Sequence, residues 1–427
     1  GFKAALGMDD GSYGYKDYAG SSFEVLADGV TVYTTGGKSL KISDAIAYVD
    51  IEIPAGTTTL TLKNGHGDDG STWSEHCNWC DARIILDPSS KGLLDTVELG
   101  APKSILYVGE TLQLTATPKS MGGTEMSTGV SLSYTTSDSA VATISSAGLL
   151  TATGEGTVTV TVTASKDGRG AEDTFTLQCL SEDSTTSFLL NSPEGSLQVL
   201  LQNSDAGLTY MVVKDGVTAV AASAVGYTTQ TVDFTSGLTF DSKTAVVEVN
   251  DTYRNYSGDY AYGNDHYNGQ SVTFRKDGYL YTVLLRAYED GYALRSAISR
   301  GDGTDGTLTV TDDKTAVKFP SGTTLWASQI SSRTILKGHS YETGFPTVQI
   351  ESTEGLNLFK APLARVNENL WVLVSEAEVY GDLYIGSIFK GIGDNTLEYT
   401  AGPVKTTENG VTSAEIDAYT DEELAEK

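Results

Sequence analysis

The sequence predicts an all-β protein of three β-sandwich domains in a string, the third of them a large two-sheet sandwich. Residues 58–62, 158–162 and 271–274 alternate between polar and apolar side chains, the two-residue period of a half-buried strand. Asp-Gly and other glycine-rich turns separate such runs and are typical of hairpins. No repeated strand-helix unit of the kind that builds a (β/α)₈ barrel is visible.

Length and charge narrow the class of protein further. A chain of 427 residues suggests about three domains. Its 28 basic and 56 acidic residues give a net charge of −28, which repels nucleic acid and anionic lipid. A neutral partner such as a glycan is compatible with that charge, and the acidic residues are candidate calcium ligands.

The apolar runs and the number of cysteines bear on the expected cellular location of the protein. No run of 18 apolar residues is present, so we expect no membrane span. Three cysteines do not make a disulfide framework. We expect a soluble bacterial protein, secreted or held at the cell surface, whose natural N-terminus lies upstream of Gly1 or has been removed.

Residues 1–87 read as the first sandwich. Strand, Asp-Gly turn and strand follow one another over residues 22–33, and further alternating runs end with a strand at 82–86. Three motifs, G-M-D-D (7–10), F-x-V-x-A-D-G (23–29) and H-x-x-W-x-D-A-R (76–83), resemble an NPCBM module, a carbohydrate-binding module found beside glycosidases. Compared with that family we expect the module's first strands to be lacking, and that either an upstream segment was lost or another chain supplies those strands.

The loop over residues 65–79 holds the candidate sugar site. Sugar rings stack on aromatic platforms and bond to a few planar polar groups. The candidate binding residues of these types are Trp73, His76, Asn78 and Asp69. The alternative interpretation is structural: Trp79 packs in the core, and Asp81 pairs with Arg83.

Two metal hypotheses arise in the same domain. Cys77 and Cys80 form a C-x-x-C pair that could bind zinc, form a small disulfide, or stay free and buried. Asp9, Asp10 and Asp68 are candidate calcium ligands, although acidic turn residues are more often only solvated.

Residues 96–180 read as the second sandwich. The run T-S-D-S-A-V-A-T-I (136–144) leads to G-L-L-T-A (148–152), and G-x-G-T-V-T-V-T-V (154–162) then alternates. This pattern resembles a bacterial immunoglobulin-like domain of group 2, which implies a spacer or an adhesive stalk module. A short polar connector is expected at residues 181–190.

Residues 189–410 read as the third domain, and residues 411–427 as an acidic tail. Several motifs occur in order: N-S-P-E-G-S-L (191–197), L-T-Y-M-V (208–212), D-T-Y (251–253), N-D-H-Y-N (264–268) and L-R-A-Y-E-D-G-Y-A-L-R (285–295). Together they resemble the N-terminal β-domain of glycoside hydrolase family 97. That family sends a glutamate from this domain to a calcium in the catalytic cleft, and Glu342, downstream of Trp326, is the best match.

The resemblance also bears on catalysis. In family 97 a barrel comes after the β-domain and carries the catalytic carboxylates, and no residue here matches them, so we assign no catalytic residue. Glu376 and Glu378 lie two apart on one predicted strand, a spacing that suits an inverting pair only by coincidence.

The sequence therefore predicts the non-catalytic, carbohydrate-binding and scaffolding portion of a secreted bacterial glycoside hydrolase, an α-glucosidase or α-galactosidase assisted by calcium. Its expected partners are a glycan and a catalytic barrel, C-terminal to this segment or on another chain. The alternative is a cell-surface adhesin or structural stalk with a sugar-binding head. The residues encoded after Lys427 distinguish the two: a barrel there indicates an enzyme, and further immunoglobulin-like repeats or an anchor indicate an adhesin.

Overall fold

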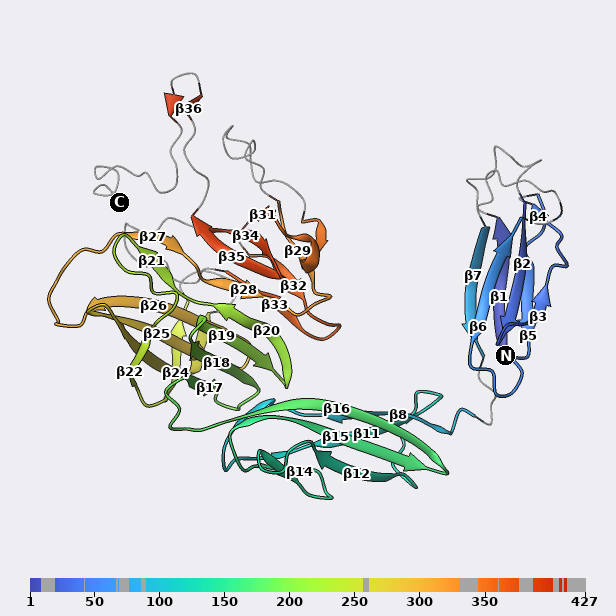
Figure 1. Ribbon diagram of the computed structural model, residues 1–427, viewed down its shortest axis with the longest axis horizontal. Coiled ribbons are helices and arrows are strands. Elements are labelled where there is room, and N and C mark those ends of the chain that lie inside the picture. Colours follow the sequence, from blue (N-terminus) through green and yellow to red (C-terminus); the bar gives the residue numbers. More distant parts are fainter. Residues whose placement is uncertain are drawn as a thin grey trace. The chain divides into compact units, whose positions relative to one another are not determined.

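A computed structural model describes residues 1–8, 20–41, 43–66, 68, 77–85, 90–255, 261–329, 345–359, 361–375, 387–401, 407–408 and 411–412. These residues form β-strands and one 3₁₀ turn, η2 (Ile350–Ser352), and they contain no α-helix (Figure 1). The all-β class expected from the sequence is confirmed. Among the described residues, no helix is long and apolar enough to cross a membrane.

The chain divides into two compact units, which are described separately. The first unit comprises Gly1–Glu98, Thr117–Ser131 and Thr163–Glu172. The second comprises Leu99–Ala116, Leu132–Val162 and Asp173–Lys427. The division passes through the immunoglobulin-like segment, and the domain boundaries expected from the sequence stay predictions.

The N-terminal part of the first unit consists of two small antiparallel sheets. One sheet has the order β5 (Ala47–Ile51), β1 (Phe2–Met8), β7 (Cys77–Ile84). The other contains β3 (Val30–Thr34), β2 (Gly20–Ala27) and β4 (Leu40–Lys41), with β6 (Leu60–Gly65) also paired to β2. Alternate side chains of β1 and β2 are buried, as the two-residue period predicts. The buried core consists of Phe2, Ala4, Leu6, Phe23, Val25 and Val49.

Four hairpins are closed by the same Asp-Gly turn. At Asp28-Gly29, Asp167-Gly168, Asp215-Gly216 and Asp277-Gly278 both residues have positive φ, between 47° and 83°. Positive φ at both central positions defines the type I′ turn, whose twist matches that of the strands it joins. The sequence signal for hairpins therefore rests on a backbone requirement that Asp and Gly tolerate better than other residues.

The immunoglobulin-like segment is built from short sheets around its own core. The strands are β8 (Leu94–Gly100), β9 (Ile105–Tyr107), β10 (Thr111–Gln113), β11 (Thr115–Ser120), β12 (Ser131–Thr136), β13 (Ala142–Ile144), β14 (Leu149–Ala152), β15 (Gly156–Lys166) and β16 (Arg169–Leu180). They pair in the orders β10-β14-β13, β12-β15-β16-β9 and β11-β8. Strand β9 runs parallel to the end of β16. Alternate residues of β15, among them Val158 and Val160, are buried in the core, as the sequence pattern predicts.

The described part of the large C-terminal domain carries two large sheets and three smaller ones. The eight-stranded sheet has the order β17 (Ser187–Asn191), β18 (Leu197–Ser204), β19 (Gly207–Lys214), β20 (Val217–Ala224), β28 (Ala316–Lys318), β35 (Thr396–Ala401), β34 (Ser387–Gly393), β31 (Asn357–Leu358). The five-stranded sheet contains β22 (Thr239–Lys243), β24 (Tyr262–Lys276), β25 (Tyr279–Ala287) and β26 (Tyr292–Arg300), with β23 (Val247–Arg254) also paired to β24.

The smaller sheets are a four-stranded one and two two-stranded ones. The four-stranded sheet has the order β30 (Thr347–Gln349), β29 (Thr324–Trp326), β32 (Leu363–Arg365), β33 (Trp371–Leu373). Strands β21 (Tyr227–Thr229) and β27 (Val310–Asp313) pair with each other, as do β36 (Thr407–Glu408) and β37 (Val411–Thr412). Of the expected acidic tail, residues 413–427 lie outside the described residues.

One continuous core joins the eight-stranded and five-stranded sheets. Phe188 of β17 packs edge-on against Phe274 of β24, with ring centroids 5.9 Å apart. Tyr210 of β19 and Tyr292 of β26 also meet, and the Tyr210 hydroxyl donates to the Ala316 carbonyl at 3.0 Å. The side chains of both sheets thus fill one interior, which is the sandwich arrangement that the sequence predicts.

Within the second unit, a buried glutamine connects the immunoglobulin-like segment to the large domain. Gln198 of β18 is fully buried. Its Oε1 accepts from the backbone N–H groups of Ser104 (3.1 Å) and Ile105 (3.2 Å). Its Nε2 donates to the Ile105 carbonyl at 2.8 Å and to Asn191 Oδ1 at 2.9 Å. Every polar group of this side chain that could be stranded in the interface therefore has a partner.

Apolar side chains surround this glutamine. Ile105 and Leu180 of the immunoglobulin-like segment form one buried cluster with Leu189, Leu200 and Val213 of the large domain. The Tyr107 hydroxyl donates to the Leu189 carbonyl at 3.0 Å and accepts from the Leu189 N–H at 3.2 Å. Burial raises the pKa of Tyr107, which keeps the hydroxyl protonated as a donor. The two parts therefore share a core and are not joined only by the polar connector at 181–190.

We expect Gln198→Leu to lower the free energy of unfolding of the second unit by about 1–3 kcal/mol, because it strands buried backbone groups of Ser104 and Ile105 without partners. The measurement is guanidinium denaturation of the full chain. Gln202→Leu is the matched control: this neighbouring side chain donates at 3.3 Å to Ser187 of the same domain, so its loss should cost less. Equal effects of the two substitutions would contradict the assignment.

Candidate functional site

The predicted sugar-binding loop is described only at its ends. Trp73, His76 and Asp69 lie outside the described residues. Asn78 lies on β7 between Cys77 and Trp79, and its side chain is exposed on the face opposite the core. Of the four candidate residues, the structure therefore places only Asn78, on the solvent side of the sheet next to the loop.

Trp79 forms part of the core, as the structural interpretation predicts. Its ring packs edge-on against Phe23, with centroids 5.2 Å apart, and lies 6.2 Å from Phe2. Its indole Nε1 donates to Asn64 Oδ1 at 2.7 Å, and Asn64 Nδ2 donates to Cys77 Sγ at 2.5 Å. Asn64 of β6 thus ties the two sheets together at the base of the loop. Sequence reasoning missed this role, since an isolated asparagine in a strand carries no distinctive signal.

The end of β7 also agrees with that interpretation. Asp81 and Arg83 form an ion pair on the surface. Cys77 packs against the core while Cys80 is exposed, because residues three apart in a strand face opposite sides. All three cysteines of the chain are free thiols. The two sulfurs of the C-x-x-C pair are therefore not directed at a common zinc ion.

The calcium candidates are described in one case only. Asp9, Asp10 and Glu342 lie outside the described residues. The Asp68 carboxylate accepts from the Ser39 N–H at 3.0 Å, and the Asp68 N–H donates to the Ser39 hydroxyl at 3.1 Å. These bonds hold the pKa of Asp68 below its usual value. Within the described part of the chain, no three His, Cys, Asp or Glu side chains gather as a metal site would require.

In the large domain, the N-D-H-Y-N motif lies on β24 and is tied to neighbouring elements. Asn268 Nδ2 donates to the Asn191 carbonyl at 3.0 Å. His266 Nε2 lies 2.8 Å from a carboxylate oxygen of Glu248 on β23. Tyr267 faces outward, where the Arg286 guanidinium lies 4.5 Å above its ring and Tyr288 packs beside it. Through these contacts His266 and Asn268 help to hold β24 against neighbouring elements of the fold.

Glu289 joins two motifs that lie far apart in the sequence. Its Oε1 accepts from the Glu194 N–H at 2.5 Å, and its other oxygen accepts from the Ser196 hydroxyl. The E-D-G turn after β25 is thus fixed to the S-P-E-G-S turn before β18. Burial acts to raise the pKa of Glu289, but the bonds from Ser196, Glu194 and Ser192 outweigh it and hold the pKa below the usual value.

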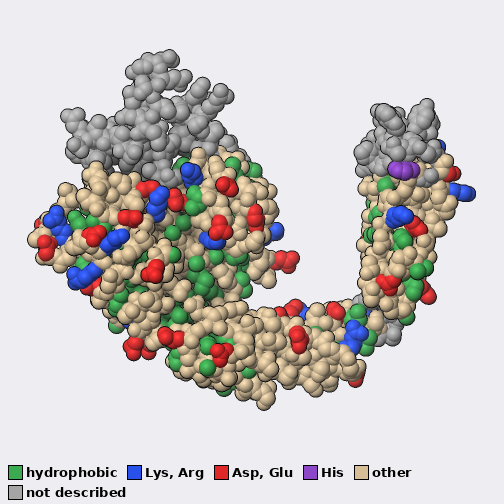
Figure 2. All heavy atoms as spheres, in the orientation of Figure 1, with side chains coloured by type: hydrophobic (Ala, Val, Ile, Leu, Met, Phe, Trp, Pro, Cys, Tyr) green, Lys and Arg blue, Asp and Glu red, His purple; other side chains and the backbone are tan. Residues whose placement is uncertain are grey.

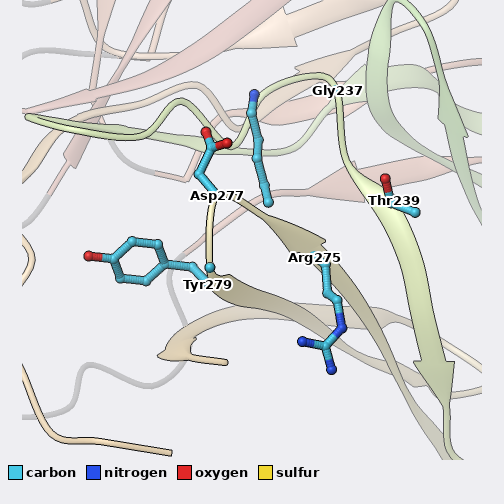
Figure 3. A pocket seen from close by; sticks show the side chains of 7 residues that line it. Gly237, Thr239, Arg275, Asp277 and Tyr279 are labelled. Atoms are coloured by element: carbon cyan, nitrogen blue, oxygen red, sulfur yellow. The ribbon is translucent and has the colours of Figure 1, made fainter. Parts of the chain in front are cut away.

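A surface hollow lies beside the turn that joins β24 to β25 (Figure 3). Its volume is about 550 Å³, and it is lined by Gly237, Thr239, Arg275, Lys276, Asp277, Gly278 and Tyr279. Figure 3 shows that the side chains of Arg275, Asp277 and Tyr279 point in different directions. Arg275 is bonded to Asp241, and Lys276 Nζ donates to the Ser236 carbonyl at 2.5 Å. A binding site needs convergent polar groups, which this hollow does not offer.

Comparison with protein-family models gives three matches. Residues 190–407 match the model described as glycosyl-hydrolase 97 N-terminal. Residues 1–85 match the NPCBM/NEW2 domain, and residues 94–175 match the bacterial Ig-like domain of group 2. The resemblances seen in the sequence are therefore confirmed. No curated protein matches the chain.

Solved structures provide more distant matches. A glycoside hydrolase family 97 enzyme from Pseudoalteromonas sp. strain K8, in complex with acarbose, is 16% identical with a TM-score of 0.44. The match covers 50% of this chain and 31% of that enzyme. A β-arabinopyranosidase is 22% identical with a TM-score of 0.46, over 53% of this chain and 37% of that one. The chain thus spans about a third of the length of these structures.

We expect Glu289→Gln to lower the free energy of unfolding of the large domain at pH 7 by about 1 kcal/mol, because the amide oxygen can accept only one of the two hydrogen bonds, and less strongly than a carboxylate, while the amide NH2 cannot accept the other. A carboxyl whose pKa is lowered on folding stabilises the protein above its unfolded pKa, and that contribution is lost as the pH falls through the folded pKa. The difference between variant and wild type should therefore shrink below about pH 4. Urea denaturation across pH measures it, with exposed Asp290→Asn as the control. A difference that persists unchanged at pH 3 would contradict this role.

Proposed function

The chain belongs to the glycosyl-hydrolase 97 N-terminal family, and from this premise we propose that it is the carbohydrate-binding and scaffolding portion of a secreted bacterial glycoside hydrolase. The observation that carries the proposal is the order of the three matched domains: an NPCBM module, an immunoglobulin-like domain and the family-97 N-terminal domain lie on one chain. NPCBM modules bind sugars and occur beside glycosidases. The order of the domains is therefore the order expected for a sugar-binding module attached to an enzyme.

The contacts in the large domain support a scaffolding role. Asn268 and Glu289, two polar residues of the motifs that mark the family, are bonded to the backbone of the turn at 191–196. A side chain that holds two turns together is not available for proton transfer to a substrate. The motifs therefore specify the shape of the domain, and the chemistry belongs to another part of the enzyme.

The rest of the parent enzyme is inferred from the family. Its catalytic barrel lies C-terminal to this segment or on another chain, and it hydrolyses α-glucosidic or α-galactosidic bonds. Glu342 contributes a ligand to a calcium ion at the cleft between domain and barrel, since a carboxylate oxygen is a ligand that calcium prefers. The acidic composition of the chain is compatible with that ion.

The N-terminal module binds a neutral, galactose-like sugar through the loop at residues 65–79. Trp73 is the stacking platform, with His76, Asn78 and Asp69 as hydrogen-bonding groups. Supporting this assignment, Asn78 is exposed next to the loop, whereas Trp79 is engaged with Phe23 and Asn64 and is therefore part of the scaffold.

A second candidate function is a cell-surface adhesin or stalk. The match of residues 94–175 to a bacterial Ig-like domain favours it, because such domains act as spacers in surface proteins. The encoded sequence beyond Lys427 separates the two functions.

We expect the purified chain to release no aglycone from aryl α-glucosides or α-galactosides, with or without calcium. The reason is that no residue has been matched to the carboxylates that hydrolyse the glycosidic bond. Glu376 and Glu378, both outside the described residues, form the alternative pair. Calcium-dependent turnover that Glu376→Gln abolishes would show that this chain is itself catalytic.

On a glycan array we expect the chain to bind neutral galactose-like glycans, and Trp73→Ala to weaken binding about thirtyfold, since loss of an aromatic hot spot costs about 2 kcal/mol. Trp79→Ala should instead destabilise the module, because its ring packs against Phe2 and Phe23. Melting temperatures of both variants separate the two effects. Intact binding by a folded Trp73→Ala variant would place the platform elsewhere. No glycan binding by the wild type would overturn the proposal.

A further inference from the structure

The four-stranded sheet of the large domain has an exposed aromatic face. In β29, β32 and β33, Leu325, Ala364 and Val372 lie opposite one another and pack toward the core. Since side chains alternate along a strand, the residues on either side of these three lie on the other face of the sheet. The residues of the three strands on that face are Thr324, Trp326, Leu363, Arg365, Trp371 and Leu373.

Two indole rings and a guanidinium meet on this face. The ring centroids of Trp326 and Trp371 are 5.1 Å apart, with 34° between the ring planes. Arg365 Cζ lies 5.8 Å from the first ring and 5.9 Å from the second. We call these three residues the Trp–Arg–Trp cluster. Its three groups are nearly equidistant, so they form a compact triangle about the width of one sugar ring.

The cluster is accessible to a ligand. Trp371 is 47% exposed, and its neighbour Leu373 is 62% exposed. Trp326 is half-buried, and Arg365 is exposed. A single exposed leucine needs no explanation, but next to it the exposed Trp371 packs on the half-buried Trp326, and together they form a contiguous apolar surface of the kind that marks an interaction site.

The guanidinium of Arg365 contacts two aromatic rings. Several other basic side chains are paired with carboxylates, in the pairs Lys3–Asp50, Lys63–Glu24, Lys119–Glu98, Lys214–Asp215, Arg275–Asp241, Lys314–Glu398 and Lys318–Asp394. On the face shown in Figure 2, acidic and basic side chains of the large domain are likewise interspersed. No carboxylate of the described residues lies within ion-pair distance of Arg365, whose guanidinium instead lies over the two indole rings in cation–π contact.

We propose that the Trp–Arg–Trp cluster binds an acidic saccharide, in which the ring of a hexuronic acid stacks on the indoles and its carboxylate pairs with Arg365. Indole faces bind the C–H face of a pyranose ring, and a guanidinium fork matches a carboxylate in bidentate geometry. Charge complementarity selects the acidic sugar over a neutral one, because Arg365 is a cation without a carboxylate partner among the described residues of a chain of net charge −28. Repulsion from distant acidic residues is screened beyond about 8 Å at physiological ionic strength, so the local pair decides.

This site is separate from the loop at residues 65–79 and goes beyond the function proposed above. The two sites also differ in ligand class, since the loop is assigned a neutral sugar. Each can therefore fail without the other.

The test is isothermal titration calorimetry of the full chain with oligomers of galacturonic acid and of glucuronic acid. EDTA is present throughout, so that calcium cannot bridge uronate and protein. The methyl-esterified form of each oligomer is the matched control ligand, because it keeps the ring and loses the charge. We expect at least one uronate oligomer to bind, and its methyl ester to bind at least about tenfold more weakly.

Three substitutions locate the binding. Arg365→Gln and Trp371→Ala should each weaken uronate binding at least about tenfold, since one removes the charge and the other the stacking face. Tyr253→Ala, which removes another aromatic side chain that is 51% exposed in the same domain, should leave affinity within about twofold. Trp73→Ala should also leave it unchanged, which separates this site from the one in the N-terminal module. Circular dichroism confirms that each variant is folded.

Three results would overturn the proposal. One is that none of the oligomers binds. Another is that the methyl esters bind as tightly as the acids, which would remove the role of Arg365. The third is that a folded Trp371→Ala variant retains full affinity, which would place the uronate elsewhere on the chain.

Discussion

The arrangement of the second unit depends on one buried side chain, Gln198. A primary amide offers two donors and an acceptor with two lone pairs, and here each is used against a backbone group or Asn191. An apolar residue could fill the space but could not satisfy the peptide groups of Ser104 and Ile105, which a strand arriving from another domain brings into the interface. The apolar side chains around the glutamine, Leu189 and Leu200 among them, hold the two parts together but do not specify their orientation. The directional hydrogen bonds of Gln198 specify that orientation.

At the family motifs, too, polar side chains form the specific hydrogen bonds that orient neighbouring elements. Residues that look chemically active in the sequence, such as His266 and Glu289, are engaged in holding strands and turns in place. By contrast, Arg365 and Trp371, which carry no recognisable motif in the sequence, are exposed to solvent in the Trp–Arg–Trp cluster. Hydrogen-bonding capacity that is used within the fold is not available to a ligand, so exposed groups without such bonds indicate interaction better than polar composition does.

The sequence predicted the strands and the domain types, because both depend on local signals. Alternation at 158–162 and the Asp-Gly turns are properties of neighbouring residues, and the structure agrees with them. The roles of Asn64 and Gln198 could not be predicted, since each is defined by partners far away along the chain. Trp371 and Arg365 were missed for a related reason: they meet Trp326 only after β29, β32 and β33 pair in register. Among the candidate sugar-binding and calcium-binding residues, the structure describes only Asn78 and Asp68. The assignment of these residues to binding sites therefore stays a prediction.

The four Asp-Gly hairpins limit the positions at which residues can be inserted into this chain during evolution. A type I′ turn has two central residues, and a third would shift the pairing register by one position. At Asp277-Gly278 such a shift would separate Phe274 of β24 from its partner Tyr281 of β25, both now buried, and would turn the core residues of one of the two strands toward solvent. Gly216 is constrained further, because a Cβ there would lie 2.0 Å from the Ala101 carbonyl oxygen. Insertions are therefore tolerated only away from these turns. In homologous domains we expect other loops to vary in length while these hairpin turns keep two residues.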